Sequence, residues 1–497
     1  MRSIFTLLMI TSLVYFYVHN NAPDYQTSTV LAKELEIIEV DFDSKATNGS
    51  PLVFGGAQTP EITDQAGWDA IADAGVTVIR KGFLIENILQ GDITVESYKN
   101  NVSNIQDPSN WNLNSIEHIK NVYQNAKNRN IKVIGVVAYM PEWLGYSGKY
   151  SIPSDWGVFF DIVKKTYRIY RPYIDYIEIW NEPDNKNFFN INNSKLSRHE
   201  AYTKMFSVAA EAIRSVDKEE NDNRLIPIIG PAAAQPEKTD ILDHLITNVP
   251  STLLNGISLH SYDKDEPSWY TFKKVLEREN LDLPIFIDEW NESSEYKANP
   301  YIYSNLAIPY TGTKLISFLK GGVAAANYYS MSLYDPYNPI KNEDVFGFYV
   351  RRNDKVELLP QGKTWKLLSV TLALGKGQSE IYQTNSDNTP SLGFVNMKGE
   401  RGIIISNEKS TKEVLINLKN LPDSGTSTIK AYQASSESDG QSLTCSKSVS
   451  VRDGAVQFTV QVPENSVVGI VIEPLKINVE TIKNVLGLTT KVDCIIK

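Results

Sequence analysis

Two glutamates, Glu182 and Glu289, stand near the ends of short apolar runs, "IDYIEIWNE" (174–182) and "PIFIDEWN" (284–291). If both runs are parallel strands of one barrel, the residues at their carboxyl ends meet at the same face of the fold. A pair of carboxylates placed in this way can hydrolyse a glycosidic bond, one as general acid and the other as nucleophile or base. The two groups then need different pKa values, so that one holds a proton while the other is charged.

Side chains near other predicted strand ends complete a candidate substrate site: Asn181, Arg80, His260, Tyr262, Trp143 and Trp290. The charge of Arg80 would keep a nucleophilic carboxylate ionised, and the Tyr262 hydroxyl would orient it. Asn181 could hold the 2-hydroxyl group of a sugar, a contact that strengthens in the transition state. The two tryptophans offer flat faces on which sugar rings could stack.

Each of these residues also has an ordinary structural explanation. A single glutamate at a strand end is usually a solvated loop residue, and His260 or Arg80 alone could serve the core or a salt bridge. The order of the two glutamate motifs on separately predicted strands favours the catalytic interpretation. A metal site made of His260, Asp263 and the glutamates lacks a second histidine or tight ligand spacing, so no metal or other cofactor is expected.

Eight short apolar runs alternate with amphipathic stretches between residues 50 and 375. Continuous apolar runs are typical of parallel strands that are covered on both faces. The pattern predicts an α/β fold, a (β/α)8 barrel. An open doubly wound sheet is the alternative, but no glycine-rich phosphate loop follows the first strand. The predicted strands are 52–57, 77–83, 132–139, 174–182, 225–232, 256–263, 284–291 and 323–331.

The pattern changes near residue 376. Short alternating strands separated by "PDSG", "DG" and "PEN" predict an antiparallel β-sandwich over 376–475, followed by a C-terminal tail, 476–497. Residues 24–50 have the composition of a polar lead-in. Cys445 and Cys494, the only cysteines, could form one disulfide in an exported protein or remain two separate thiols.

Composition narrows the function class. The hydrophobic share of 42% and charged share of 22% are those of a globular protein. A net charge of −10, without a dense Lys/Arg cluster, argues against a nucleic-acid binder.

Residues 1–22 combine Arg2 with an apolar stretch that is short for a membrane span, which predicts a signal peptide. Because the cleavage site is poor, an uncleaved membrane anchor is the alternative. Sequons at Asn48, Asn101, Asn192 and Asn291 agree with a secreted protein.

The two glutamate motifs also resemble those of a known group. "WNEP" and "IDEWN" are similar to the acid/base and nucleophile motifs of the glycoside hydrolase clan A, whose members share a (β/α)8 barrel. "EIWNEPDNKNFF" (178–189) resembles glycoside hydrolase family 39 more closely, and "IIGPA", "ISLHSYD" and "LPIFIDEWNES" continue the likeness in order. The resemblance implies a retaining glycosidase in which Glu182 is the acid/base and Glu289 the nucleophile. It also implies a carbohydrate substrate and a β-sandwich beside the barrel.

The chain departs from the family pattern at two places. Where family members often carry a tryptophan after the eighth strand, this chain offers Tyr328, Tyr329 or Tyr334. Asp288 stands before the predicted nucleophile, where threonine or serine is common, and strand alternation should turn it away from the site. Glycosylation of Asn291 would block the cleft, so this sequon is expected to be unmodified. A catalytically silent carbohydrate-binding or adhesion protein, or a hydrolase of another family in the clan, remains the alternative.

Overall fold

The structure is a computed structural model that describes residues 35–474, apart from 192–193, 263–267, 298, 338–344, 375–376, 387 and 423. The predicted signal peptide or anchor (1–22), the sequon at Asn192 and the tail with Cys494 lie outside the described residues. The disulfide between Cys445 and Cys494 therefore stays a prediction. In the part of the chain that is described, none of the helices has the length and apolarity needed to cross a membrane.

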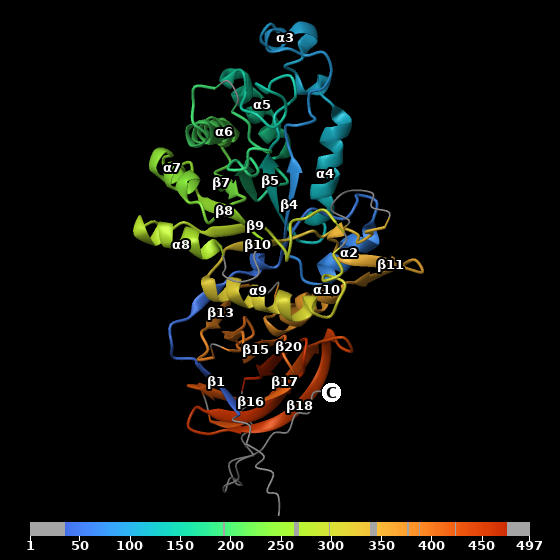
Figure 1. Cartoon of the computed structure of the whole chain (residues 1–497), viewed down its shortest axis with the longest axis vertical. Helices are drawn as coiled ribbons and strands as arrows, with labels where there is room; N and C mark the ends of the chain where they lie inside the picture. The colour runs from blue at the N-terminus through green and yellow to red at the C-terminus, as the bar shows by residue number, and fades with distance from the viewer. Residues whose placement is uncertain are drawn as a thin grey trace, which may run out of the picture. The chain divides into compact units, whose positions relative to one another are not determined.

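Between residues 55 and 329 the chain forms a closed barrel of eight parallel strands (Figure 1). Each of the eight predicted apolar runs contributes one strand, so the prediction of a (β/α)8 barrel is confirmed and the open sheet is excluded. The order around the barrel follows the sequence, and the last strand pairs with the first. The strands are β3 (Gly55–Ala57), β4 (Val78–Phe83), β5 (Lys132–Val137), β6 (Tyr176–Ile179), β7 (Ile228–Ala233), β8 (Gly256–Ser261), β9 (Ile285–Trp290) and β10 (Ala325–Tyr329).

Helices connect successive barrel strands and cover their outer faces. The longest begins with a capping box, in which the Ser197 hydroxyl accepts from the Glu200 N–H and the Glu200 carboxylate accepts from the Ser197 N–H. The helices are α2 (Gln65–Asp73), α3 (Val95–Lys99), α4 (Leu113–Lys127), α5 (Trp156–Tyr170), α6 (Arg198–Glu220), α7 (Asp240–Asn248), α8 (Trp269–Arg278), α9 (Ala307–Gly321) and α10 (Pro360–Thr371). A hairpin of β11 (Tyr349–Arg352) and β12 (Lys355–Leu358) precedes α10.

The barrel interior has an apolar layer and, above it, a polar one. Every second residue of a strand faces the interior. The apolar layer is a cluster of buried residues near the strands' amino ends: Leu52, Val78, Ile134, Ile229, Phe286 and Ala325. Two residues beyond Val78, Phe286 and Ala325 lie the buried polar side chains of Arg80, Asp288 and Asn327, and Glu178 lies two residues beyond Tyr176, which packs against the apolar layer. The period of two thus brings charged groups together at the carboxyl ends.

Two antiparallel sheets form the predicted β-sandwich. The larger sheet has the order β18-β17-β20-β15-β14-β13-β2, and the smaller one the order β1-β16-β19. Apolar side chains from both sheets share one buried cluster. The strands are β1 (Glu36–Asp41), β2 (Thr47–Gly49), β13 (Ser379–Tyr382), β14 (Ser391–Val395), β15 (Arg401–Asn407), β16 (Lys412–Lys419), β17 (Gly425–Ala434), β18 (Asp439–Val451), β19 (Val456–Val462) and β20 (Ser466–Ile472).

The expected polar lead-in is wrong for residues 36–49. Ile38 and Val40 of β1 are fully buried in the sandwich core, and β2 pairs with β13. The segment is short and half polar because only alternate residues face the core. Strands from both sides of the barrel sequence therefore build the sandwich.

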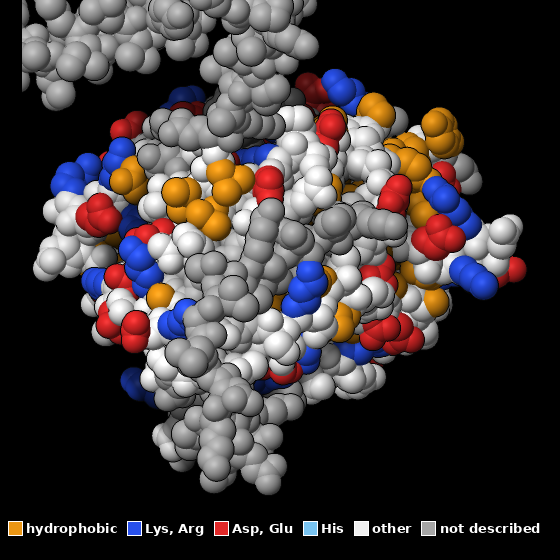
Figure 2. Space-filling model, turned by 90° about the horizontal axis from the view of Figure 1, so that it is seen from below, with side chains coloured by type: hydrophobic (Ala, Val, Ile, Leu, Met, Phe, Trp, Pro, Cys, Tyr) orange, Lys and Arg blue, Asp and Glu red, His pale blue; other side chains and the backbone are white. Residues whose placement is uncertain are grey.

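Helices α9 and α10 pack against the larger sheet on one side and belong to the barrel on the other (Figure 1). Ser406 of β15 donates a hydrogen bond of 2.8 Å to the backbone oxygen of Pro309 in α9. A side chain at Gly469 of β20 would meet Thr371 of α10 at 2.4 Å, so glycine permits this close approach. Figure 2 shows the molecule from below relative to Figure 1, and on this surface basic and acidic side chains are interspersed.

Candidate active site

Glu182 is held by an unusual backbone turn at the end of β6. Trp180 and Glu182 have φ values of 73° and 52°, in the left-handed region that side-chain-bearing residues rarely adopt. The Glu182 N–H donates to the Ala232 oxygen at 3.0 Å, and the Trp180 ring N–H donates to the Phe188 oxygen at 2.9 Å. Such a conformation costs about 1–3 kcal/mol of free energy per residue and needs surrounding contacts to persist. These contacts direct the Glu182 carboxylate into the barrel mouth.

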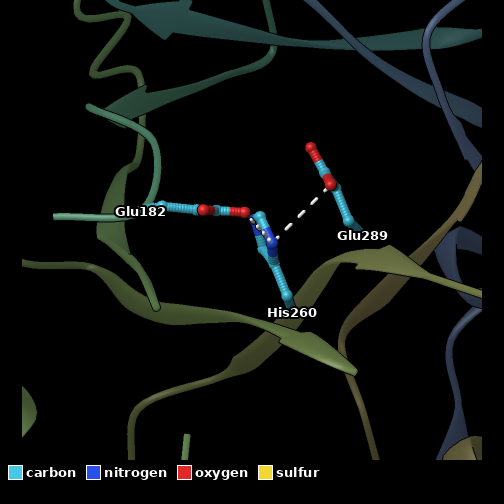
Figure 3. A group of neighbouring side chains, drawn as sticks. All are labelled: Glu182, His260 and Glu289. Carbon is cyan, nitrogen blue, oxygen red and sulfur yellow. Dashed lines mark ion pairs between the residues drawn. The ribbon is translucent and has the colours of Figure 1, made fainter. Parts of the chain in front are cut away.

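The Glu182 carboxylate has two partners. Its Oε1 lies 3.1 Å from His260 Nδ1, and its Oε2 accepts a hydrogen bond of 2.7 Å from Asn185 Nδ2 (Figure 3). Burial raises the pKa of Glu182, but the hydrogen bond and charge of His260 and the hydrogen bond from Asn185 lower it by more, so its pKa is lowered overall. Without that imidazolium, burial would favour the protonated acid.

The Glu289 carboxylate is oriented on both oxygens. Arg80 Nη1 donates to Oε1 at 2.7 Å, and the Tyr262 hydroxyl donates to Oε2 at 2.8 Å. Figure 3 shows Glu289 and Glu182 approaching His260 from different sides, and His260 Nδ1 lies 3.6 Å from Glu289 Oε2. One carboxylate oxygen of each glutamate and a ring nitrogen of His260 lie within 4.8 Å of one another.

Arg80 joins the two glutamate motifs from β4. Its Nε lies 2.5 Å from Glu178 Oε2, and its Nη2 donates to Asn181 Oδ1 at 2.8 Å. The same Nη2 lies 3.3 Å from Asp288 Oδ2, while Nη1 binds Glu289. Burial by itself would lower the pKa of this guanidinium, but the surrounding carboxylates raise it. Removing this charge would leave several buried carboxylates unpaired, which is strongly destabilising.

Glu178 is a member of the site that the sequence motifs did not assign. Burial, followed by the charge of Asp288, raises the pKa of Glu178 to about 8, against the opposing charge of Arg80. The signal was present in "YIEI", an apolar strand interrupted by one acid. Because Glu178 stands two residues after Tyr176, which packs against the apolar barrel layer, the period of two already turned it inward.

The expectation that Asp288 points away from the site is wrong. Leu259 pairs with Ile287, but His260 pairs with Glu289, so β9 carries one extra residue at this point. A bulge of this kind breaks the strict alternation of a strand. Asp288 follows the inward Phe286 by two residues and is fully buried, and the extra residue lets Glu289 reach the interior as well. The Oδ2 of Asp288 lies 3.3 Å from His260 Nε2.

His260 therefore stands between three carboxylates, those of Glu182, Asp288 and Glu289. Burial would lower the pKa of His260, but the charges of Glu289 and Asp288 and the interactions with Asp288 and Glu182 raise it well above its usual value. These charges favour the protonated imidazole, whose Nδ1 lies 3.1 Å from Glu182 Oε1 and whose Nε2 lies 3.3 Å from Asp288 Oδ2.

The predicted sugar-stacking role of Trp290 is wrong. Trp290 is fully buried, and its ring stacks on Trp365 with centroids 5.7 Å apart and an angle of 8° between the planes. Since Glu289 faces the interior, its neighbour turns outward into the helix layer. Trp143 is half-buried: its ring stacks on Tyr98 at 5.6 Å, and its ring N–H donates to the Leu89 oxygen at 3.3 Å.

Asn181 and two tyrosines line the remaining part of the site. Asn181 Nδ2 donates to the Tyr139 hydroxyl at 2.8 Å, a partner that the sequence motifs did not indicate. At the end of β10, where family members often have tryptophan, the Tyr329 ring lies 6.4 Å from Tyr262. Tyr328 instead packs outward on Trp290, so Tyr329 occupies the position beside the site.

Glu182, His260 and Glu289 also lie close enough together to be metal ligands. The raised pKa of His260 keeps a proton on the ring, and a protonated imidazole does not ligate a metal. The Arg80 guanidinium beside Glu289 would repel a cation. Asp263, the other ligand considered from the sequence, lies outside the described residues. The arrangement fits carboxylate chemistry better than metal binding.

Comparison with known sequences points to one family. The family model described as Glycosyl hydrolases family 39 matches residues 173–400, a segment that contains both glutamates. A search of curated proteins finds no match.

Comparison with solved structures shows the same fold. The chain is similar to a glucosidase from Croceicoccus marinus, with a TM-score of 0.65, 15% identity, and coverage of 89% of this chain and 99% of the other. It is also similar to a monomeric β-xylosidase from Caulobacter crescentus, with a TM-score of 0.64, 15% identity, and coverage of 89% and 100%. A GH39 enzyme from Xanthomonas axonopodis pv. citri has a TM-score of 0.62 at 16% identity, with coverage of 89% and 98%.

Proposed function

We propose that this chain, whose residues 173–400 match the family 39 model, is a retaining O-glycosyl hydrolase of clan A that cleaves oligo- or polysaccharides by double displacement. Glu289 is the nucleophile and Glu182 the acid/base. The observation that supports this is the carboxylate spacing. Oxygens of the two glutamates lie within 4.8 Å, whereas an inverting site holds its carboxyl groups about 6.5–9.5 Å apart to admit a water molecule.

In the first step, a Glu289 oxygen attacks the anomeric carbon while the bond from that carbon to the leaving oxygen breaks. Glu182 gives its proton to the leaving oxygen, so the aglycone departs as an alcohol. Arg80 and Tyr262 fix the direction of the nucleophile through hydrogen bonds to its two carboxylate oxygens. The product of this step is a glycosyl ester of Glu289.

In the second step, the ionised Glu182 takes a proton from a water molecule, whose oxygen attacks the anomeric carbon. The ester bond breaks, Glu289 regains its charge, and Glu182 is protonated for the next cycle. Two inversions at the same carbon leave the sugar with its original configuration.

The proposed substrates are β-xylosides and β-glucosides, because structural neighbours carry the names β-xylosidase and glucosidase. The test is product stereochemistry. Proton NMR during cleavage of 4-nitrophenyl β-xyloside and β-glucoside should show the β-anomer first, followed by mutarotation. Initial release of the α-anomer would contradict the retaining mechanism, and binding of these glycosides without hydrolysis would favour a silent carbohydrate-binding protein.

We also propose that the protein is exported and carries a cleaved signal peptide or, alternatively, an N-terminal anchor. The sequon residues Asn48 and Asn101 are exposed, as glycosylation requires. Asn291 has an exposed fraction of only 1%, and its side chain donates to the Tyr329 oxygen at 2.5 Å. This burial supports the expectation that Asn291 is unmodified.

Replacing Asp288 is expected to change the pH dependence. The protonated His260 lowers the pKa of Glu182. Glu182 therefore loses the proton that it needs as general acid at a lower pH, and this loss sets the alkaline limb of the kcat/KM profile. In Asp288→Asn, His260 loses a facing carboxylate, so its pKa should fall. The pKa of His260 is raised well above its usual value and that of Glu182 is lowered, so the imidazolium still faces Glu182 while Glu182 titrates. Glu182 loses the repulsion of Asp288, which lowers its pKa further, so the alkaline limb of the kcat/KM profile should move to lower pH.

The measurements are the pH profile with 4-nitrophenyl β-xyloside and titration of His260 by nitrogen-15 NMR. The groups facing this imidazole besides Asp288 come from several elements: Arg80, Glu178, Glu182, Tyr262 and Glu289. All are unchanged in the variant, and Asp288→Glu should restore a wild-type profile in part. An alkaline limb that stays in place, or moves to higher pH, would contradict the role assigned to Asp288.

A further inference from the structure

Exposed tyrosines gather on the segments that follow β9 and β10. Among the described residues, Tyr296 and Tyr303 lie after β9 with exposed fractions of 57% and 41%, and Tyr337 lies after β10 with 95%. Large aromatic side chains normally bury most of their area. Three exposed rings on two segments at the carboxyl ends of barrel strands are a feature that the catalytic pair does not use.

A pocket of about 580 Å³ lies among these segments. Its walls come from the β9–α9 loop, from the residues after β10 and from the β11–β12 hairpin, which also contacts α2 (Figure 1). This volume is in the range typical of small-molecule sites, roughly 300–1,000 Å³. The side chains that matter here are Tyr303, Tyr334, Tyr337, Arg351 and Arg352.

The pocket combines ring faces with guanidinium donors. The Tyr303 and Tyr334 rings lie 5.5 Å apart at an angle of 31°, and the Arg352 guanidinium lies 5.6 Å from the Tyr303 ring centre. Arg352 is 3.6 Å from Glu357, with both side chains about half exposed, and such a pair contributes little. Its N–H groups can therefore turn to a ligand. Flat apolar faces beside several hydrogen-bond donors suit sugar rings and their hydroxyl groups.

A chain of contacts links the pocket to the nucleophile. Tyr262, which binds Glu289, lies beside Tyr329, and the Tyr329 ring is 5.1 Å from Phe346. The exposed Tyr296 shares a hydrogen bond of 2.9 Å with the Tyr329 hydroxyl. Gly347, the residue after Phe346, packs closely on Tyr334 of the pocket, since a Cβ atom at this glycine would lie 2.3 Å from Tyr334. The pocket and the catalytic pair therefore belong to one side of the barrel mouth.

We propose that this pocket is a distal sugar-binding subsite, which holds units of a glycan chain while a bond further along is cleaved between Glu182 and Glu289. The enzyme then acts preferentially on extended chains, from oligosaccharides upward, and short glycosides leave the pocket empty. This inference rests on the proposed glycosidase function. It names the substrate class of that site as a chain of several sugars.

The test compares long and short substrates in Tyr303→Ala and Tyr337→Ala. Xylohexaose and cellohexaose are the long probes, and the corresponding 4-nitrophenyl glycosides are the short ones. For the hexaose that is cleaved, we expect KM to rise about tenfold in each variant, the loss of one favourable ring contact. The kcat/KM for the short glycoside should change less than twofold, and Tyr303→Phe should behave as the wild type.

Tyr270→Ala is the matched control, since Tyr270 lies on α8 with an exposed fraction of 44%, close to that of Tyr303. It should leave both substrate classes unaffected. The subsite proposal would be overturned if Tyr303→Ala and Tyr337→Ala lost equal activity on long and short substrates, or if their KM for the hexaose did not change. It would also be overturned if the wild type cleaved short glycosides but neither hexaose. Failure of the wild type to cleave both the hexaoses and the short glycosides would instead count against the proposed function, which separates the two hypotheses.

Discussion

Glu289→Gln is expected to lower kcat by on the order of 10⁴-fold or more, because the amide cannot attack the anomeric carbon. The side chain keeps its size, and Tyr262 and Arg80 can still reach its oxygen or lie beside its nitrogen. The fold should therefore persist, although one charge in a buried cluster is lost. Steady-state kinetics with an aryl glycoside, together with circular dichroism, measure the two effects separately.

A chemical rescue identifies the role of Glu289 more closely. In Glu289→Gly, azide can enter the space of the carboxylate and attack the anomeric carbon, which should yield a glycosyl azide of inverted configuration. Glu277→Gln is the matched control, since Glu277 is exposed on α8. Turnover within tenfold of the wild type in Glu289→Gln would disprove that Glu289 is the nucleophile.

Glu182→Ala is expected to affect substrates according to their leaving groups. Natural glycosides need protonation of the leaving oxygen, so their kcat should fall on the order of 10²–10⁴-fold, the usual contribution of a general acid. Aryl glycosides with acidic phenols depart without that proton, so the first step should be nearly normal and the glycosyl ester should accumulate. A burst of phenol followed by slow turnover is the expected time course.

The configuration of the azide product distinguishes the role of Glu182 from that of Glu289. In Glu182→Ala, azide attacks the ester of Glu289 without base assistance, so the glycosyl azide should retain the original configuration. Equal losses for all leaving groups, without a burst, would contradict the acid/base role and indicate a structural one. An azide product of inverted configuration would argue that the two roles are exchanged.

The local pattern of the sequence was sufficient to predict the barrel and to place the two glutamates at its mouth. Continuous apolar runs are a local signal of strands that are buried on both faces, and each of the eight runs became a strand. Strand order in a parallel barrel follows chain order, so the motifs at 182 and 289 had to meet at one mouth. The same logic placed Arg80 and Tyr262 beside Glu289, and their catalytic roles stay predictions that the variants above will test.

Tertiary structure decided how individual side chains around this pair are directed. Asp288 and Glu289 both reach the interior, and Trp290 turns outward, because β9 gains a residue relative to β8. A bulge depends on pairing between strands, so period-two reasoning within one strand cannot reveal it. The same non-local pairing placed β1 in the sandwich, where its partner β16 lies far away in sequence.

The sequence by itself determined which residues stand at strand ends, since hydrophobic periodicity is written locally in the chain. Only the folded structure determined the charges within the site, since a pKa depends on every group that comes close in space. Burial and the contacts of Glu178, Asp288 and His260 arise from three different strands, and they shift the pKa values of these three groups and of Glu182.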